Sequence, residues 1–161
     1  MSLKIPDIAY QNYLSGYPGK AIAELEKLDL NEVCSETLAL LLRALIELDR
    51  AEDCIAISRK LNPSQINGEV IYWVGVAKYL CRFPLPEIQE AFQQSLLKGG
   101  RLGSLGMAFL AYVDGDYAGA EKLAKVDLSK ETVEYQHIQL MIQAQIAMAS
   151  RRYDSAFEYL D

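Results

Sequence analysis

The chain has 161 residues, 51% of them hydrophobic and 24% charged. This composition can fill a continuous core, and the net charge per residue is too low for a disordered chain. Its formal net charge of −6 argues against nucleic acid or an anionic membrane as a partner, because both require clustered Lys and Arg. The sequence has no apolar run that could span a membrane and no secretion-signal pattern. Cys34, Cys54 and Cys81 lie far apart, so we expect reduced thiols and a cytoplasmic location.

Apolar residues recur at helical spacing in segments that fall into pairs. In chain order these pairs are 6–14 with 20–28, 35–48 with 51–61, 69–81 with 86–97, 102–113 with 117–126, and 130–150 with 153–161. Pro18 suits a first helical turn, and Ser35 is expected as an N-cap. Asn62-Pro63 and Gly99-Gly100 stop helices. Because the connections are short and no linker divides the chain, we predict one all-α domain.

The second segments of the pairs recur with a nearly constant period. Each contains one small or apolar residue at an equivalent place, and these anchors are separated by 33, 34, 32 and 36 residues: Ala21, Cys54, Ile88, Ala120 and Ala156. A period of about 34 residues is typical of a helical repeat array. Arrays of this kind present surfaces to other molecules, which predicts a binding protein and not an enzyme.

One turn carries the motif of a known family. Residues 115–120, with the sequence GDYAGA, resemble the Gly-x-Tyr-x-x-Ala turn between the two helices of a tetratricopeptide repeat (TPR). With Ala120 at repeat position 20, Tyr153 and Ala156 fall at positions 17 and 20 of the last repeat. The chain departs from the family pattern in lacking the Trp of position 4, the Gly of position 8 and the Pro of position 32.

The resemblance implies a right-handed superhelical solenoid of antiparallel helix pairs, in a single domain over residues 1–161. The implied repeats are 3–30, 35–63, 69–98, 101–127 and 130–161. The last repeat is truncated, which leaves Ala156, Phe157 and Leu160 without a covering element. We therefore expect either that the chain is a segment of a longer protein or that it forms a homodimer through this C-terminal edge.

The resemblance also implies which side chains line the inner, concave face. In the family, positions 2, 5, 9 and 12 of each repeat face inward, and this register predicts the following contact residues: Tyr10, Tyr13, Arg43, Trp73, Leu105, Phe109, Tyr112, Met141, Gln145 and Met148. Aromatic residues and Met are common interface anchors, which favours an apolar groove for a peptide or helix. The alternative for each aromatic residue is a place in the core.

No catalytic residue, cofactor or metal ligand is predicted. His137 has no Ser, Cys or Asp at a hydrolase spacing and is expected on a helix surface. The glycine-rich segment 99–106 resembles a phosphate loop but follows a helix and lacks the closing Gly-Lys-Ser/Thr. We expect Gly103 and Gly106 to permit close helix packing instead. Residues 114–116 lack the remaining oxygen ligands of a calcium loop and are expected to form a turn.

Three hypotheses for function follow. The leading one is a non-enzymatic scaffold that binds a protein or peptide segment in its concave groove. The second is a sensor or regulatory TPR segment of a larger bacterial transcription regulator or signalling protein, and the third is a small secretion-system chaperone. Among the predicted inward residues only Arg43 is basic, which argues against the clamping of acidic chaperone tails.

Overall fold

The computed structural model describes residues 7–129 and 133–159, and every regular element in these ranges is a helix, as the sequence predicts. The first helices of successive pairs are α1 (Asp7–Leu14), α3 (Ser35–Glu47), α5 (Gly68–Leu80), α7 (Leu102–Val113) and α9 (Val133–Ala149). Their partners are α2 (Pro18–Leu25), α4 (Ala51–Ser58), α6 (Leu85–Leu97), α8 (Tyr117–Ala124) and α10 (Tyr153–Glu158). A short 3-10 helix, η1 (Pro63–Gln65), precedes α5.

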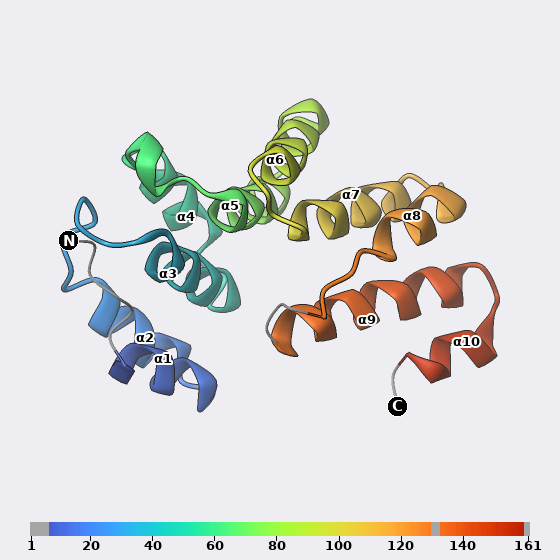
Figure 1. Cartoon of the computed structure of the whole chain (residues 1–161), viewed down its shortest axis with the longest axis horizontal. Helices are drawn as coiled ribbons and strands as arrows, with labels where there is room; N and C mark the ends of the chain where they lie inside the picture. The colour runs from blue at the N-terminus through green and yellow to red at the C-terminus, as the bar shows by residue number, and fades with distance from the viewer. Residues whose placement is uncertain (1–6, 130–132, 160–161) are drawn as a thin grey trace.

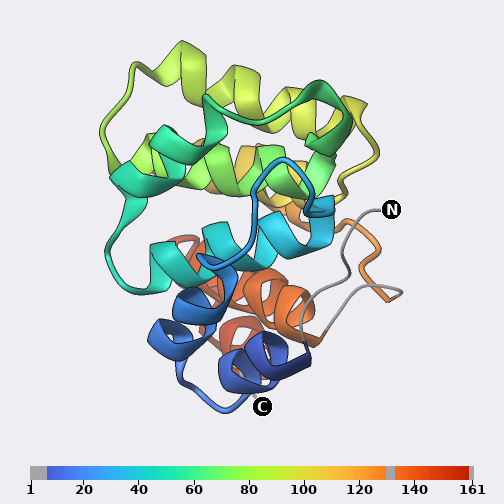
Figure 2. The ribbon, with the colours of Figure 1, turned by 90° about the vertical axis from the view of Figure 1, so that its left-hand side faces the viewer.

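Consecutive helices pack against each other along the chain, both within pairs and from the second helix of one pair to the first helix of the next. The first helices also pack in succession, α3 on α5, α5 on α7 and α7 on α9. The pairs follow one another along an arch, with α1 and α2 at one end and α9 and α10 at the other (Figure 1). The turns from α3 to α4 and from α5 to α6 lie on one side of the molecule, whereas the loops leading into α5 and α7 reach the opposite side (Figure 2).

The same turn joins the two helices of every described pair. One residue in each turn has a left-handed backbone, with φ between 57° and 84°: Gly16, Asp49, Arg82, Gly115 and Arg151. The next residue donates its backbone N–H to the carbonyl five positions earlier, as Arg50 does to Leu45 at 2.9 Å and Asp116 to Ala111 at 2.9 Å. This hydrogen-bond pattern is a Schellman motif. Because it recurs at matching positions, the pairs are structurally equivalent units.

The core explains why small residues recur in the sequence. All five anchors of the repeat period are buried in second helices of pairs. Gly75 and Gly106 leave space for the ring of buried Phe92, because a methyl group on either glycine would collide with that ring. A methyl group on Gly103 would lie 2.5 Å from the Phe92 carbonyl oxygen. The expectation that Gly103 and Gly106 permit close helix packing is therefore confirmed.

Local details differ from the sequence-based expectation. Some helix limits differ by up to three residues: α2 begins two residues earlier and ends three residues earlier than expected, and α4 ends three residues earlier. Ser35 is not the N-cap of α3: Cys34 occupies that position with extended backbone, and its sulfur contacts the Thr37 hydroxyl at 3.2 Å, bridging the first turn. Helix η1 was not expected. It places the Gln65 amide where it donates to the carbonyls of Leu30 at 2.5 Å and Val33 at 3.0 Å, so a tertiary contact organises this loop.

Some predicted features fall outside the described residues. These are residues 3–6 of the first predicted repeat, residues 130–132 of the ninth predicted segment, residues 160–161 of the tenth, and the side chain of Phe157. Of the side chains expected to lack a covering element at the last repeat, only that of Ala156 is described; it is buried, so the expectation was wrong for this residue. None of the helices in the described ranges combines the length and apolar character that crossing a bilayer requires.

Candidate functional site

The predicted inner-face residues differ widely in their exposure to water. Tyr13, Trp73 and Leu105 are buried in the core. Tyr10, Met141 and Met148 are exposed, with 38%, 53% and 46% of their surface accessible. The other four are partly buried: Arg43, Phe109, Tyr112 and Gln145. The ten residues therefore do not form one open groove, and only part of the set is available to a partner.

Arg43 lies at the centre of a cluster to which four first helices contribute. Its guanidinium carbon lies 4.9 Å from the ring centroid of Tyr13 on α1, 5.8 Å from that of Trp73 on α5, and 5.6 Å from that of Tyr135 on α9. The Trp73 and Tyr135 rings are 6.3 Å apart. A guanidinium group is attracted to the faces of aromatic rings. Arg43 thus links α3 to helices from three other pairs.

Two carboxylates complete this cluster, which we call the Arg43 cluster: Tyr13, Arg43, Glu47, Glu69, Trp73 and Tyr135. Arg43 Nε lies 3.5 Å from Glu47 Oε1, and the Tyr13 hydroxyl donates to the same carboxylate. The Tyr135 hydroxyl donates to Glu69. Burial, and then the charge of Glu69, raises the pKa of Tyr135 well above its ordinary value. Tyr135 is therefore a neutral donor at physiological pH, and the Glu47 carboxylate faces the Arg43 guanidinium.

One polar atom of the cluster stays without a hydrogen bond. The indole N–H of Trp73 is buried, and no atom of the described residues accepts from it. The Trp73 side chain lowers the pKa of Tyr135, against the larger effect of burial. An unpaired buried N–H is costly, so the packing of the rings must outweigh it. The cluster holds helices together and contains no free base or nucleophile.

Sequence reasoning included Tyr13, Arg43 and Trp73 but missed their partners. Tyr135 lies two residues before the first position of the fifth repeat in the family register, so the register could not include it. Glu69 and Glu47 fall at positions that the family does not direct inward. A usable signal was available for Glu47, because it follows Arg43 by four residues and so lies on the same side of α3.

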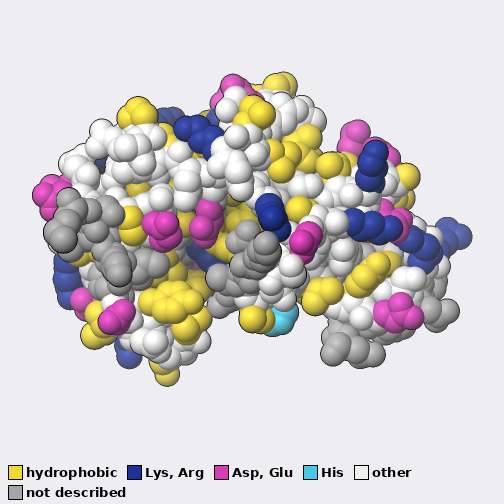
Figure 3. All heavy atoms as spheres, viewed as in Figure 1, with side chains coloured by type: hydrophobic (Ala, Val, Ile, Leu, Met, Phe, Trp, Pro, Cys, Tyr) yellow, Lys and Arg dark blue, Asp and Glu magenta, His cyan; other side chains and the backbone are white. Residues whose placement is uncertain are grey.

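The exposed part of the predicted surface lies mainly on α9. Met141, Gln145 and Met148 are spaced by four and three residues and share one side of this helix. His137 precedes Met141 by one turn and is exposed, as predicted. The histidine side chain lies beside hydrophobic side chains on the face drawn in Figure 3. This stripe, Met141, Gln145 and Met148, is hereafter the α9 face.

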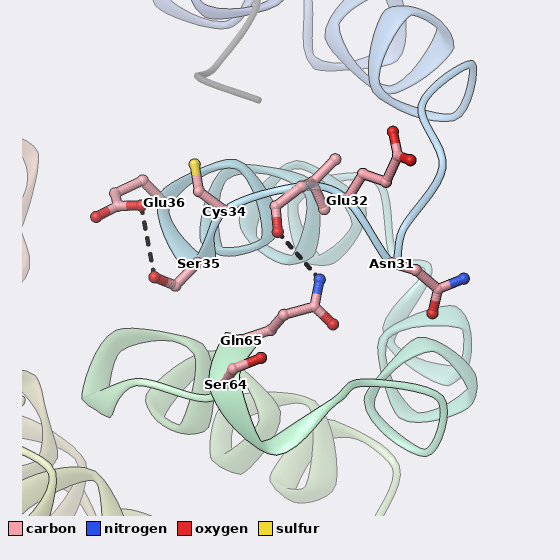
Figure 4. Close-up of a pocket in the computed structure, with 8 residues that line it drawn as sticks. Asn31, Glu32, Cys34, Ser35, Glu36, Ser64 and Gln65 are labelled. Carbon is pink, nitrogen blue, oxygen red and sulfur yellow. Dashed lines mark hydrogen bonds between the residues drawn. The ribbon is translucent and has the colours of Figure 1, made fainter. Parts of the chain in front are cut away.

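A separate polar hollow of about 670 Å³ lies beside the start of α3. Glu32, Ser35 and Glu36 come from the α3 side, whereas Ser64 and Gln65 come from η1 (Figure 4). A backbone hydrogen bond, and then the side chain of Cys34, lowers the pKa of Glu36. The described residues that line the hollow include two carboxylates and no basic side chain, which disfavours an anionic ligand.

Within residues 7–129 and 133–159, no three His, Cys, Asp or Glu side chains gather as metal ligands would. Comparisons of the chain with protein-family models, with curated proteins and with solved structures found no match. The function is therefore inferred from the chain's own residues.

Proposed function

We propose that this protein is a TPR-like, right-handed solenoid that acts in the cytoplasm as a non-enzymatic scaffold for protein binding. The equivalent turns and the buried anchors support the repeat architecture, because the two helices of each pair are joined with the same backbone geometry. The three cysteines are free thiols, which agrees with a reducing compartment.

The observation that carries the binding proposal is the exposure of Met141 and Met148. Both are large apolar side chains at positions that the family register directs toward a ligand, and about half of each is in contact with water. Met side chains adapt to partners of different shape, because the thioether chain is flexible and polarizable. The proposed ligand is an amphipathic helix or an extended apolar segment that packs on the α9 face.

The proposed contact set is narrower than the sequence-based one. It keeps the exposed inner-face residues and three of the four partly buried ones, namely Tyr10, Phe109, Tyr112, Met141, Gln145 and Met148. Arg43 is left out because its guanidinium already packs on the rings of Tyr13, Trp73 and Tyr135. Tyr13, Trp73 and Leu105 are assigned to the core that supports this surface, because a partner cannot reach side chains that are already buried. Replacing Trp73 would therefore test stability and not binding.

The proposal is tested with a photo-crosslinking amino acid at position 141. A captured protein is mapped to the crosslinked segment, and that segment is synthesised for calorimetric titration. The double variant Met141→Glu, Met148→Glu should weaken binding by roughly tenfold or more, since it places charge in an apolar contact. The control is Leu97→Glu, which changes a residue that is 79% exposed on α6. Equal affinity of the double variant and the unmodified protein would reject the α9 face.

A further inference from the structure

Two apolar hollows lie on either side of Phe83, in the connection between α5 and α6. The first, of about 410 Å³, lies between α4 and α5 and is lined chiefly by Ile55, Leu61, Ile66, Val70, Ile71 and Val74. The second, of about 480 Å³, is lined chiefly by Tyr79, Leu80, Leu85, Ile88, Leu110 and Val113. Phe83 lines both. The two hollows thus form one surface with an aromatic ridge.

The second hollow exposes aliphatic side chains to an unusual extent. Leu80, Leu85 and Val113 are accessible over 47%, 50% and 55% of their surface. They belong to two successive helix-pair turns, so the repeat geometry brings them to the same hollow. Pro84 and Pro86 flank Leu85 and restrict the backbone of this loop. A preformed apolar hollow with a fixed rim is typical of a binding site.

Basic side chains outnumber acidic ones around this surface, whereas acidic side chains outnumber basic ones in the chain as a whole. Arg59, Lys78 and Arg82 line the hollows, against Glu87 and Asp114. Lys78 Nζ lies 3.8 Å from Glu87 Oε2, so that carboxylate already faces a cation. Arg59 and Arg82 form no ion pair with the described residues. A locally basic rim on a chain with a formal net charge of −6 favours an acidic partner.

We propose that the two hollows dock an acidic amphipathic helix of another protein. One large apolar side chain of that helix enters each hollow across Phe83, and its carboxylates face Arg59 and Arg82. This surface shares no residue with the α9 face. Failure of one proposal therefore leaves the other unaffected.

The probes are two fluorescently labelled amphipathic peptides of about 14 residues, or four helical turns. Both carry Leu and Phe at the same positions, and they differ only in having Glu or Lys at the polar positions. Fluorescence anisotropy should give a dissociation constant roughly tenfold lower for the Glu peptide, and this preference should shrink at high salt. Equal affinities, or no saturable binding, would overturn the proposal.

Charge reversal identifies the surface. The variant Arg59→Glu, Arg82→Asp should lose the preference for the Glu peptide and favour the Lys peptide; Asp is chosen because position 82 has a left-handed backbone, which Asp tolerates. The variant Phe83→Ser should bind both peptides with lower affinity, whereas Leu97→Ser should bind both with unchanged affinity. An unchanged preference after charge reversal would show that the peptide binds elsewhere.

Hydrogen exchange on the unmodified protein gives a second test that does not depend on the variants folding. The Glu peptide should protect backbone amides in residues 79–88 and not those of α9. Protection confined to other segments would contradict the proposal. A dimer that light scattering detects and that dissociates when the Glu peptide is added would also contradict the proposal. A second copy of the chain would then be the natural occupant of this surface.

Discussion

Three of the turn positions with left-handed backbone carry a side chain, although glycine adopts this conformation more easily. Asp49, Arg82 and Arg151 have φ values of 62°, 57° and 58°. Their Cβ atoms crowd the backbone, which costs about 1–2 kcal/mol for an ordinary residue. The turn persists because its two hydrogen bonds terminate the first helix of the pair in each case.

Arg151→Gly should therefore raise the free energy of unfolding by about 0.5–1 kcal/mol. The substitution relieves backbone strain in the folded protein, and this gain exceeds the cost of the greater conformational entropy that glycine gives the unfolded chain. Urea denaturation followed by circular dichroism measures this change. The matched control is Gly16→Ala, which should lower the free energy of unfolding by about 1 kcal/mol. Apart from Gly16 and its two chain neighbours, no atom of the described residues lies within 4 Å of the added methyl group, so that loss would come from backbone conformation alone. A destabilised Arg151→Gly variant would contradict this account.

Two buried tyrosines make the folded protein sensitive to alkaline pH. Burial raises the pKa of Tyr72 to about 12, from an ordinary value of 10.0, and also raises that of Tyr135. Both side chains are fully protonated in either state below about pH 9, so their stabilising contribution is complete there. Above pH 10 the unfolded chain loses these protons before the folded protein does. The free energy of unfolding should then fall by up to about 1.4 kcal/mol per pH unit for each residue.

Urea titrations at intervals from about pH 8 to about pH 11 measure this dependence. Tyr135→Phe should show a shallower decline than the unmodified protein, because it removes one of the two titrating groups. The variant should be less stable at neutral pH, since the hydrogen bond to Glu69 is lost. A decline of the same steepness in both proteins would exclude Tyr135 as a cause.

At the level of helices, α5, α6 and α7 meet around one aromatic ring. Gly75 on α5 and Gly106 on α7 both border Phe92 of α6. Gly106→Ala should lower the free energy of unfolding by about 2 kcal/mol, because overpacking outweighs the better helix propensity of Ala. Gly19→Ala is the control: its methyl group would lie at an ordinary 3.7 Å from Leu48 Cδ1, so that variant should be slightly stabilised. Thermal unfolding of both variants measures the difference.

A second substitution shows whether the ring is responsible. Phe92→Leu in the Gly106→Ala background should recover part of the loss, because the smaller side chain makes room for the methyl group. If the two substitutions are simply additive, the collision with Phe92 is not the cause of the destabilisation.

The helices were predictable because their limits depend on local chemistry. Proline and glycine interrupt helices through their own backbone chemistry, whatever the rest of the chain contacts. The structure begins or ends an element beside each of the interruptions predicted from the sequence, at Pro18, Asn62-Pro63 and Gly99-Gly100. Helix η1 was not predictable in this way, because Gln65 is held by carbonyls more than thirty residues away in the sequence. Local propensity contains no information about such a contact.

The candidate surface was only partly predictable for a related reason. A family register assigns each residue a direction relative to its own repeat, and it correctly grouped Tyr13, Arg43 and Trp73. It does not say how closely distant repeats approach. Tyr135 of the fifth pair reaches Arg43 of the second and Trp73 of the third, and this approach buries residues that a more open array would expose.

At the scale of the whole molecule, most of the buried apolar residues that the structure describes fall into two clusters of unequal size. The larger spans α1 to α7 and includes Leu128 and Tyr135. The smaller consists of Ala108, Ala120, Ala124 and Ile146, which join α7, α8 and α9. Since three of these four are alanines, the smaller cluster buries little apolar surface, and the C-terminal pairs should be the less stable part.

Hydrogen exchange should therefore be faster in α8 and in the second half of α9 than in α3 and α5. Ile146→Ala should accelerate exchange in these C-terminal helices, while α3 and α5 keep their rates, because the cluster that contains Ile146 joins only α7, α8 and α9. Leu42→Ala, in the larger cluster, serves as the control and should accelerate exchange in the helices that this cluster joins, including α3 and α5. Uniform exchange rates along the chain would show that the molecule opens as a single unit.

The shared turn also bears on how such a protein can change in length. Residues 83–115 run from just after the left-handed residue of the α5–α6 turn to the left-handed residue of the α7–α8 turn, a span of 33 residues. A tandem duplication of that span would restore the same backbone direction at its end, so the chain after it could continue without a new connection. Deletion of the span would join equivalent points in the same way. Growth or loss by whole helix pairs is thus the kind of genetic change that this backbone accommodates, whereas an insertion of a few residues within a turn would misalign the helices after it.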